Sequence, residues 1–314
     1  MLVRMLACHF RGVSSKSFLC VLCAFVVNVD KVSIMKLRLV GLAMISAAPL
    51  HAQQPQIITG LKQPESVAIG PGGKVYVSET GEYEKANDGY ISVLEEGKLR
   101  RFASGLDDPH GIKWYRDHLF VSDNMGMVWR IDAQGNAERF VDATDFPRKI
   151  TNFNDLEIDR NGNLYLSDSG DWDGGGGAIY RITQQKKITP VITSDDDVRV
   201  VSPNGLLMDG NHLLEVDYTT GILFRIDLEA KSLEKMVGGL GASDGLVRDA
   251  AGRLIVTDFA GHRVFVLTRP DAKPQETAVG GIESAADLAI SPDGKSLLIP
   301  DMSGGKLAIM PLPR

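Results

Sequence analysis

The chain repeats one short pattern six times, at the spacing of propeller blades. Each copy has a turn, an aliphatic strand, a second turn, and a strand that ends in an acidic residue. The second residues of the six blade-start motifs are Glu65, His110, Asn154, Asn204, Asp244 and Ala286, at successive spacings of 45, 44, 50, 40 and 42 residues. This period, with its antiparallel hairpins, is typical of a β-propeller. The repeat therefore predicts an all-β chain that forms a six-bladed β-propeller.

The last repeat is shorter than the others and predicts how the ring closes. Residues 285–314 contain only three strands, whereas a propeller blade has four. The segment Gln56–Thr59 precedes the first motif and has the pattern of a lone strand. We expect this N-terminal strand to pair with the last blade, because that pairing covers an exposed strand edge. We also expect the aromatics of the third strands to pack blade against blade: Trp129, Tyr180, Phe224 and Phe265.

The first 52 residues fall outside the repeat. Residues 35–38 form a short basic segment with Lys36 and Arg38, residues 39–48 are an apolar run, and Ala52 supplies the small residue that a signal peptidase accepts. We interpret 35–52 as a signal peptide, 1–34 as a non-native or uncertain N-terminal extension, and 53–314 as a single propeller domain. The apolar run is too short to leave a stable membrane anchor.

Cysteine usage agrees with export. The three cysteines, Cys8, Cys20 and Cys23, all precede the predicted cleavage site. The mature domain therefore has no disulfide, thiolate metal site or cysteine nucleophile. We expect a periplasmic or secreted protein that is stabilised by its core alone.

The charge of the chain argues against a nucleic-acid partner. The formal net charge is −6, and no run of basic residues is present. Nucleic-acid-binding domains instead carry a basic patch or stripe. A closed ring has no need to associate, so we expect a monomer that acts on a small molecule.

Four of the blade-start motifs carry a side-chain oxygen in ring register: Glu65, Asn154, Asn204 and Asp244. The first strand of each propeller blade lines the central channel, so these side chains gather at one mouth. Two carboxylates and two amides suit a hard divalent cation, and their charge offsets that of the ion. Aspartate and asparagine are also common turn formers, which is the simpler reading for any one of them alone. Four in register favour one bound calcium ion, with other divalent cations as alternatives.

This Glu, Asn, Asn, Asp series resembles the regucalcin/gluconolactonase (SMP-30/gluconolactonase/LRE-like) family, and more distantly the paraoxonase-like enzymes. The motifs that carry the resemblance are Asn154-Asp155, Pro203-Asn204-Gly205 and Ser243-Asp244-Gly245. The resemblance implies a calcium-dependent hydrolase of a lactone or ester, with the four residues as metal ligands and Asp244 also as the base. His110 falls on the blade where paraoxonases carry a catalytic histidine, and is the second candidate for the base.

The substrate-binding residues are expected near the third blade. Sugar-lactone members of the family place an arginine two residues before the first ligand asparagine, where this chain has Asn152. Arg148 lies in the same loop and is a candidate to compensate. Longer hairpins at residues 80–88 and 169–177 are expected to rim the mouth, the second of them with Trp172 as an aromatic substrate contact.

Other readings of the same residues remain. The acids that end the second strands recur in nearly every blade, so we interpret them as structural groups of the turns: Asp123, Asp168, Asp258 and Asp301. A non-catalytic propeller of the NHL-repeat type would share the blade pattern and need no metal. A strictosidine-synthase-like enzyme would rely on a late glutamate, for which Glu283 is the candidate.

Overall fold

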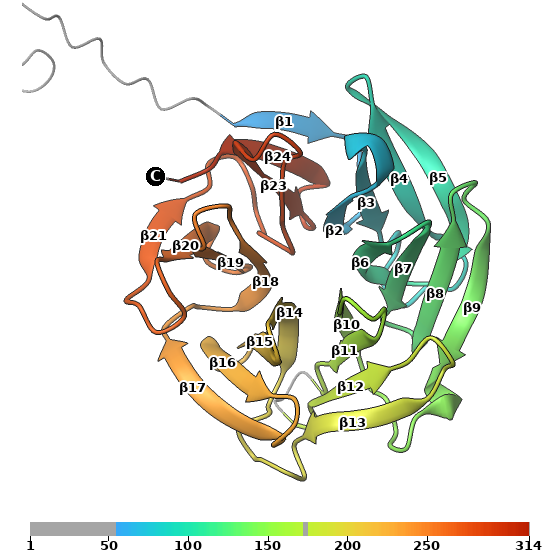
Figure 1. Cartoon of the computed structure of the whole chain (residues 1–314). Helices are drawn as coiled ribbons and strands as arrows, with labels where there is room; N and C mark the ends of the chain where they lie inside the picture. The colour runs from blue at the N-terminus through green and yellow to red at the C-terminus, as the bar shows by residue number, and fades with distance from the viewer. Residues whose placement is uncertain (1–54, 172–174, 314) are drawn as a thin grey trace, which may run out of the picture. The chain divides into compact units, whose positions relative to one another are not determined.

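The computed structural model describes residues 55–171 and 175–313, which form six antiparallel sheets of four strands around a central channel (Figure 1). The predicted signal peptide, the N-terminal extension and Trp172 lie outside the described residues. The first three blades are β2 (Pro64–Ile69), β3 (Val75–Glu79), β4 (Gly89–Glu95) and β5 (Lys98–Leu106); β6 (Pro109–Tyr115), β7 (His118–Asp123), β8 (Met127–Asp132) and β9 (Ala137–Asp142); and β10 (Phe153–Ile158), β11 (Leu164–Asp168), β12 (Ala178–Ile182) and β13 (Ile188–Thr193). The last three are β14 (Pro203–Asp209), β15 (His212–Asp217), β16 (Ile222–Asp227) and β17 (Ser232–Gly238); β18 (Ser243–Arg248), β19 (Leu254–Asp258), β20 (Arg263–Leu267) and β21 (Gln275–Ala278); and β22 (Ala289–Ile290), β23 (Ser296–Asp301), β24 (Lys306–Pro311) and β1 (Gln56–Thr59). Two 3-10 turns, η1 (Pro71–Gly73) and η2 (Ala143–Asp145), complete the described elements.

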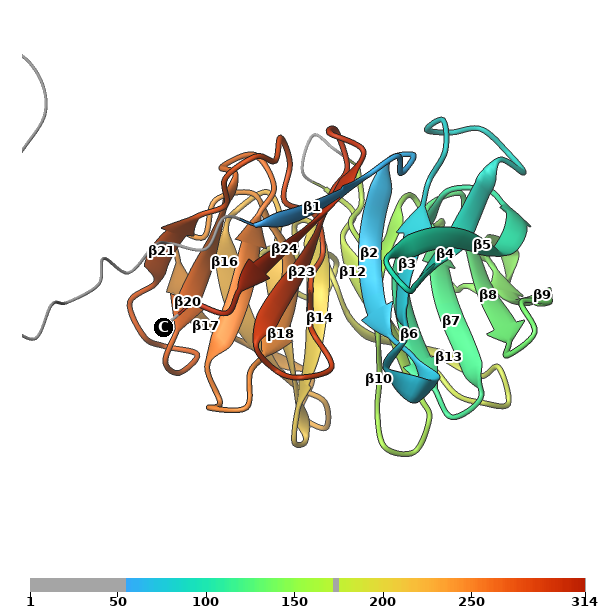
Figure 2. The same cartoon turned by 90° about the horizontal axis from the view of Figure 1, so that it is seen from above.

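The ring closes through the N-terminal strand, as the sequence predicts. Strand β1 pairs antiparallel with β24, from Gln56 opposite Ile309 to Thr59 opposite Lys306. Figure 2 shows β1 beside β24 in the edge-on view. The last blade thus gains its fourth strand from the other end of the chain, and the six-bladed propeller is confirmed.

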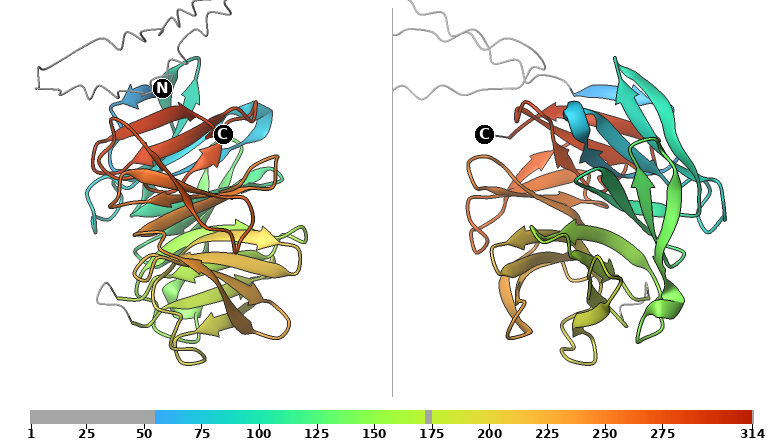
Figure 3. Two further views of the ribbon diagram at one scale, coloured as in Figure 1. Left: turned by 90° about the vertical axis from the view of Figure 1, so that its left-hand side faces the viewer. Right: turned by 45° about the vertical axis from the view of Figure 1, so that its right-hand side comes forward.

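The hydrophobic core is a ring of six clusters, and each cluster draws residues from two neighbouring blades. The cluster between blades two and three, for example, combines Phe120 and Val128 with Leu156 and Tyr180. The views in Figure 3 show the blades stacked side by side around the ring. The predicted third-strand aromatics are all buried in these clusters, which confirms their packing role: Trp129, Tyr180, Phe224 and Phe265.

The acids that end the second strands hold the turns between blades. Asp123 accepts hydrogen bonds of 3.0 Å from the backbone N–H groups of both Asp107 and Asp108. Asp168 accepts one of 2.8 Å from the backbone of Asn152. Equivalent bonds reach Asp258 from Ala242 and Asp301 from Ser284. The structural reading of these acids is confirmed.

The strand connections divide between two faces of the ring. Every first strand begins at one face, and every first-to-second-strand turn lies at the other. No helix within residues 55–171 and 175–313 is long and apolar enough to cross a membrane. The blade-start motifs are thus gathered at one face, around the channel.

Candidate functional site

A β-bulge lies at the start of the first strand in five blades. In the fourth blade Pro203 pairs with Asp217 and Leu206 with Glu215, so Asn204 and Gly205 together oppose a single residue. The ladders of the first, second, third and fifth blades shift at the equivalent place. A bulge bends the strand and re-aims a side chain. The same irregularity therefore directs the second residue of each motif in the same way.

Glycine at the third motif position allows the first strands to approach one another closely. A Cβ atom at Gly205 would lie 2.3 Å from the backbone oxygen of Asp244, and one at Gly245 would lie 2.6 Å from Cα of Asp287. A Cβ atom at Gly111 would lie 2.7 Å from Cα of Asp155. These contacts leave no room for a side chain. The glycines therefore keep the ring narrow where the candidate ligands converge.

The four predicted ligands and His110 line one cavity of about 420 Å³, which we call the mouth cavity. They come from the first strands of five different blades. Its remaining lining residues are Gln63, Tyr83, Tyr218, Phe259, Met302 and Ser303. Tyr83 belongs to the 80–88 hairpin, so the prediction that this hairpin rims the mouth is confirmed.

Some polar groups of the mouth cavity are buried without a partner among the described residues. The four predicted ligands and His110 are each 5% exposed or less. Among the described residues, no hydrogen-bond partner exists for the buried oxygens Oε2 of Glu65, Oδ1 of Asn154 and Oδ1 of Asp244. Buried polar atoms in folded proteins nearly always have a partner. Three unpaired oxygens on one cavity therefore fit a bound cation.

The carboxylates of the channel raise one another's pKa values. Burial, and then the nearby Asp287 and Asp155, raise the pKa of Asp244 well above its ordinary range. The pKa of Glu65 is raised by burial and by Asp244. A bound cation would reverse these shifts, because an adjacent positive charge favours the ionised carboxylate.

Two further carboxylates form a tier directly below the candidate ligands. Asp155 accepts the backbone N–H of Leu206 at 2.8 Å, and Asp287 accepts the hydroxyl of Ser66 at 2.5 Å. Burial, with the Asp287 carboxyl as the second cause, raises the pKa of Asp155 to about 8. Each acid bonds to the first strand of the next blade, so this tier holds neighbouring blades together beneath the cavity.

His110 faces the same cavity as a neutral imidazole at neutral pH. Burial lowers its pKa to about 4. Its Nδ1 lies 4.0 Å from Oε1 of Glu65, which is beyond hydrogen-bond distance. Both ring nitrogens are buried and have no hydrogen-bond partner among the described residues. A neutral histidine of this kind is able to accept a proton from a bound water or substrate.

The predicted substrate residues do not join this group. Arg148 and Asn152 are absent from the described lining of the mouth cavity. Arg148 instead lies 3.3 Å from the carboxylate of Asp195, and both side-chain polar atoms of Asn152 are buried without a described partner. Trp172 lies outside the described residues. Substrate contact by these three residues stays a prediction.

Three lining residues escaped the sequence reasoning although they share one position in the repeat. Tyr218, Phe259 and Met302 each follow the acid that ends a second strand. In the fourth and fifth blades the backbone N–H of this residue donates to the carbonyl two residues before the candidate ligand, at 2.9 Å. The acid marks the position in the sequence, so the repeat could have identified these residues.

Glu215 is a fourth residue that the sequence reasoning missed. It is buried at a position where the other five blades have Val77, Val121, Leu166, Val256 and Ile299. Burial, and then Asp217, raise its pKa well above the ordinary value, while a hydrogen bond from the Asn204 backbone lowers it. Glu215 thus supports the backbone of a candidate ligand, and the signal for it was the break in an aliphatic pattern.

Carboxylate clusters alone would not reveal the site. Among the described residues, no group of three or more His, Cys, Asp or Glu side chains is placed to hold a metal ion. The candidate set contains only two carboxylates, and its other two members are amides. The case for a cation therefore rests on the unpaired oxygens and on the mixture of donor types.

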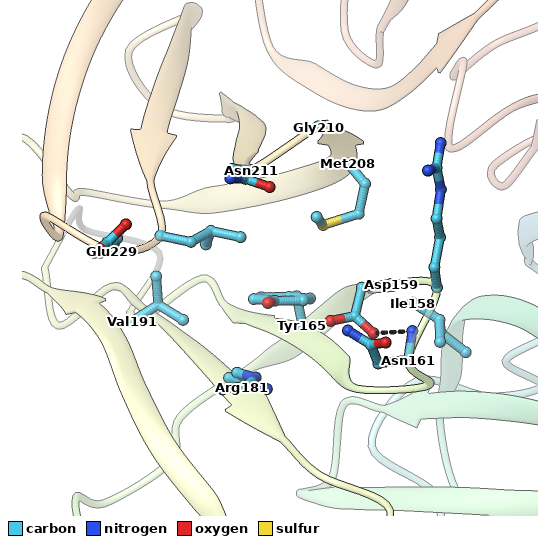
Figure 4. Close-up of a pocket in the computed structure, with 12 residues that line it drawn as sticks. Ile158, Asp159, Asn161, Tyr165, Arg181, Val191, Met208, Gly210, Asn211 and Glu229 are labelled. Carbon is cyan, nitrogen blue, oxygen red and sulfur yellow. Dashed lines mark hydrogen bonds between the residues drawn. The ribbon is translucent and has the colours of Figure 1, made fainter.

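A larger cavity of about 620 Å³, which we call the rear pocket, lies between the third and fourth blades (Figure 4). It is lined at the β10–β11, β14–β15 and β16–β17 turns, which lie on the face opposite the blade-start motifs. Its lining includes Arg160, Arg181, Tyr165, Met208 and Glu229. None of the rear-pocket residues has a buried side-chain nitrogen or oxygen that lacks a partner.

Residues 117–299 match the family model for the SMP-30/Gluconolactonase/LRE-like region. A gluconolactonase from Xanthomonas campestris is 17% identical, over 83% of this chain and 91% of that chain, with a TM-score of 0.65. The calcium-binding protein regucalcin from Agrobacterium tumefaciens is 19% identical, over 81% and 90%, with a TM-score of 0.62. Virginiamycin B lyase from Staphylococcus aureus is 15% identical, over 83% and 99%, with a TM-score of 0.57. At these identities the structures show a shared fold, and no curated protein sequence matches the chain.

Proposed function

Because the chain belongs to the SMP-30/gluconolactonase/LRE-like family, we propose that it is a calcium-dependent hydrolase of a lactone or ester. The observation that carries the proposal is the set of buried, unpaired oxygens of Glu65, Asn154 and Asp244 in one cavity with a neutral His110. A purely structural channel has no reason to bury these groups without partners.

Glu65, Asn154, Asn204 and Asp244 are the residues that would hold the ion. Oxygen donors of mixed charge suit calcium better than zinc or copper. When bound, the ion supplies Lewis-acid polarisation of the substrate carbonyl and stabilises negative charge on its oxygen.

The side chains of the cavity supply the proton transfers. Asp244 is the first candidate for the base, since a carboxylate that binds a metal through one oxygen retains the other for water. His110 is the second, because its ring is neutral and its unprotonated nitrogen has no hydrogen-bond partner among the described residues, so that nitrogen is able to accept a proton. The water oxygen bonds to the acyl carbon, the base takes its proton, and the departing oxygen receives a proton as the acyl–oxygen bond breaks.

A pH-stat assay tests the proposal directly. Lactones and aryl esters are incubated with the protein in calcium, then in excess EGTA, and then again in calcium. We expect acid release that stops on chelation and returns with calcium. Acid release that chelation does not change would remove the metal from the proposal, and release of no acid together with no bound metal would favour a binding propeller.

The strictosidine-synthase-like alternative depends on Glu283. That side chain is 65% exposed, its Oε1 lies 3.8 Å from Nζ of Lys306, and it does not line the mouth cavity. Glu283→Gln is therefore expected to leave hydrolysis unchanged. Loss of activity in this variant would instead return Glu283 to the reaction.

We further propose that the protein acts in the periplasm or outside the cell. The support is the basic and apolar segment at residues 35–52 and the cysteine-free chain that follows it. Mass spectrometry of the protein secreted by a bacterial host should give an N-terminus at Gln53. An uncleaved chain recovered from the cytoplasm would contradict export.

A further inference from the structure

The mouth cavity has an apolar side, formed by Tyr218, Phe259 and Met302, which we call the apolar wall. The three residues are contributed by consecutive blades, from the fourth to the sixth. Each is partly exposed, and the rings of Tyr218 and Phe259 meet edge to face with centroids 6.1 Å apart. Three large side chains from adjacent blades therefore line the same cavity as the candidate ligands, and two of them are in ring contact.

The corresponding positions of the first three blades carry polar residues, which make hydrogen bonds instead of lining the cavity. Thr80 and Ser169 are buried, and their hydroxyls donate to the carbonyls of Pro109 and Pro203 at the neighbouring blades. Asn124 donates to the hydroxyl of Tyr83 at 2.8 Å. None of these three residues lines the mouth cavity. The apolar wall is thus a property of one half of the ring.

The described lining of the cavity also lacks the cationic side chains that would hold an anionic substrate. Among the described residues, no lysine or arginine lines the mouth cavity. Apolar surface recognises a substituent by removing it from water, and each buried methylene adds to the preference. A polyhydroxylated ring placed against the apolar wall would lose hydrogen bonds to water without replacement.

We propose that the substrate is a lactone or ester with an uncharged alkyl or aryl substituent, which packs on the apolar wall while its carbonyl lies where Glu65, Asn154 and Asp244 would hold the cation. This inference rests on the proposed hydrolase function and narrows its substrate class. Sugar lactones are poor substrates in this view, because their hydroxyl groups would face Phe259 and Met302.

Three lactones in the pH-stat assay test the inference: γ-butyrolactone, γ-nonanolactone with its pentyl chain, and D-glucono-δ-lactone. We expect kcat/KM for the pentyl lactone to exceed that for γ-butyrolactone by about 10- to 100-fold, and the sugar lactone to be the slowest. Hydrolysis with equal kcat/KM for all three, or a preference for the sugar lactone, would overturn the substrate class and leave the hydrolase intact. Hydrolysis of none of these lactones or of the aryl esters would instead contradict the proposed function.

Two variants transfer side chains from the polar half of the ring to the apolar wall. Phe259→Asn introduces the residue of the second blade, and Met302→Thr introduces that of the first. Each is expected to lower the ratio of kcat/KM between the pentyl lactone and γ-butyrolactone by about 5- to 20-fold. Met125→Thr is the matched control, because Met125 is 45% exposed and lies outside the cavity lining. An unchanged ratio in both variants, or an equal fall in the control, would overturn the role of the apolar wall.

Discussion

The rear pocket and the mouth cavity differ in whether their buried polar groups have hydrogen-bond partners. The rear pocket is the larger, at about 620 Å³ against about 420 Å³ for the mouth cavity. Its polar groups are bonded within turns or face solvent, as where Oδ1 of Asp159 accepts the backbone N–H of Asn161 at 2.8 Å. In the mouth cavity, by contrast, Glu65, Asn154 and Asp244 bury oxygens that have no partner within the described part of the chain. Volume alone would favour the rear pocket, whereas buried oxygens without a described partner carry a free-energy cost and favour the mouth cavity.

The two cavities should differ most in how the substitution of a carboxyl group by an amide changes kcat/KM. Asp244→Asn is expected to lower kcat/KM by about 10²- to 10⁴-fold, because it removes the first candidate for the base. Glu229→Gln is the control, since it changes a carboxyl of the rear pocket to an amide in the same way. Initial rates on the best lactone measure both. If Asp244→Asn keeps full activity and His110→Gln loses it, the base is His110.

Calcium should stabilise the mouth cavity by a smaller but measurable amount. At 100 times the dissociation constant, one bound ion adds about 2.7 kcal/mol to the free energy of unfolding. For a domain of this size that corresponds to a Tm higher by roughly 5–10 °C. Differential scanning calorimetry in calcium and in EGTA measures the difference. An identical Tm in both conditions would contradict the metal site.

Glu65→Gln should distinguish a role of Glu65 in cation binding from a role in folding. Its effect on the free energy of unfolding should have opposite signs with and without calcium. Without calcium the variant removes the cost of burying the Glu65 carboxyl and its repulsion by Asp244, Asp287 and Asp155, so its free energy of unfolding is expected to rise by about 1 kcal/mol. With calcium it loses a charged ligand, so most of the stabilisation by the ion should disappear. A variant less stable than the wild type in both conditions would mean that Glu65 serves the fold.

Asp108 should contribute to the pH dependence of the free energy of unfolding. It accepts the backbone N–H of Glu84 at 2.7 Å and so holds the 80–88 hairpin at the mouth. Burial raises its pKa from an ordinary 3.8 to about 7. Between those values the folded state binds more protons than the unfolded state, so stability falls as pH rises through this window. Asp108→Asn should remove about 1–2 kcal/mol of that loss. Urea unfolding between about pH 4 and 8 tests it, and an unchanged slope would exclude Asp108 as the source.

The sequence was most informative where the repeat constrains geometry. Glu65, His110, Asn154, Asn204 and Asp244 could be placed on one cavity because the same bulge occurs at each blade start. The whole ring, including its closure by Gln56–Thr59, follows from the same period. A strict repeat converts positions in the chain directly into positions around an axis.

Prediction was weaker where side chains depart from the repeat. Asn152 lies only two residues before Asn154, but its backbone bonds to Asp168 and its side chain is not part of the cavity lining. Tyr218, Phe259 and Met302 lie in turns, where the conformation that brings a side chain to the channel depends on tertiary contacts. The repeat marks the position of these three residues, directly after the acid that ends each second strand, but the cavity lining shows which of the six such side chains reach the channel.

The smallest expected effect concerns the rear pocket and completes the comparison. Arg160 and Arg181 line it as exposed side chains, and Tyr165 lies in the same pocket (Figure 4). Because neither arginine is required to satisfy a buried group, Arg160→Gln and Arg181→Gln should each change the free energy of unfolding by less than about 0.5 kcal/mol. Lactone hydrolysis should also stay at the wild-type rate. Urea unfolding and the pH-stat assay measure the two quantities. A large loss of activity in either variant would show that cavities on both faces serve the reaction, and unpaired buried oxygens would then no longer distinguish them.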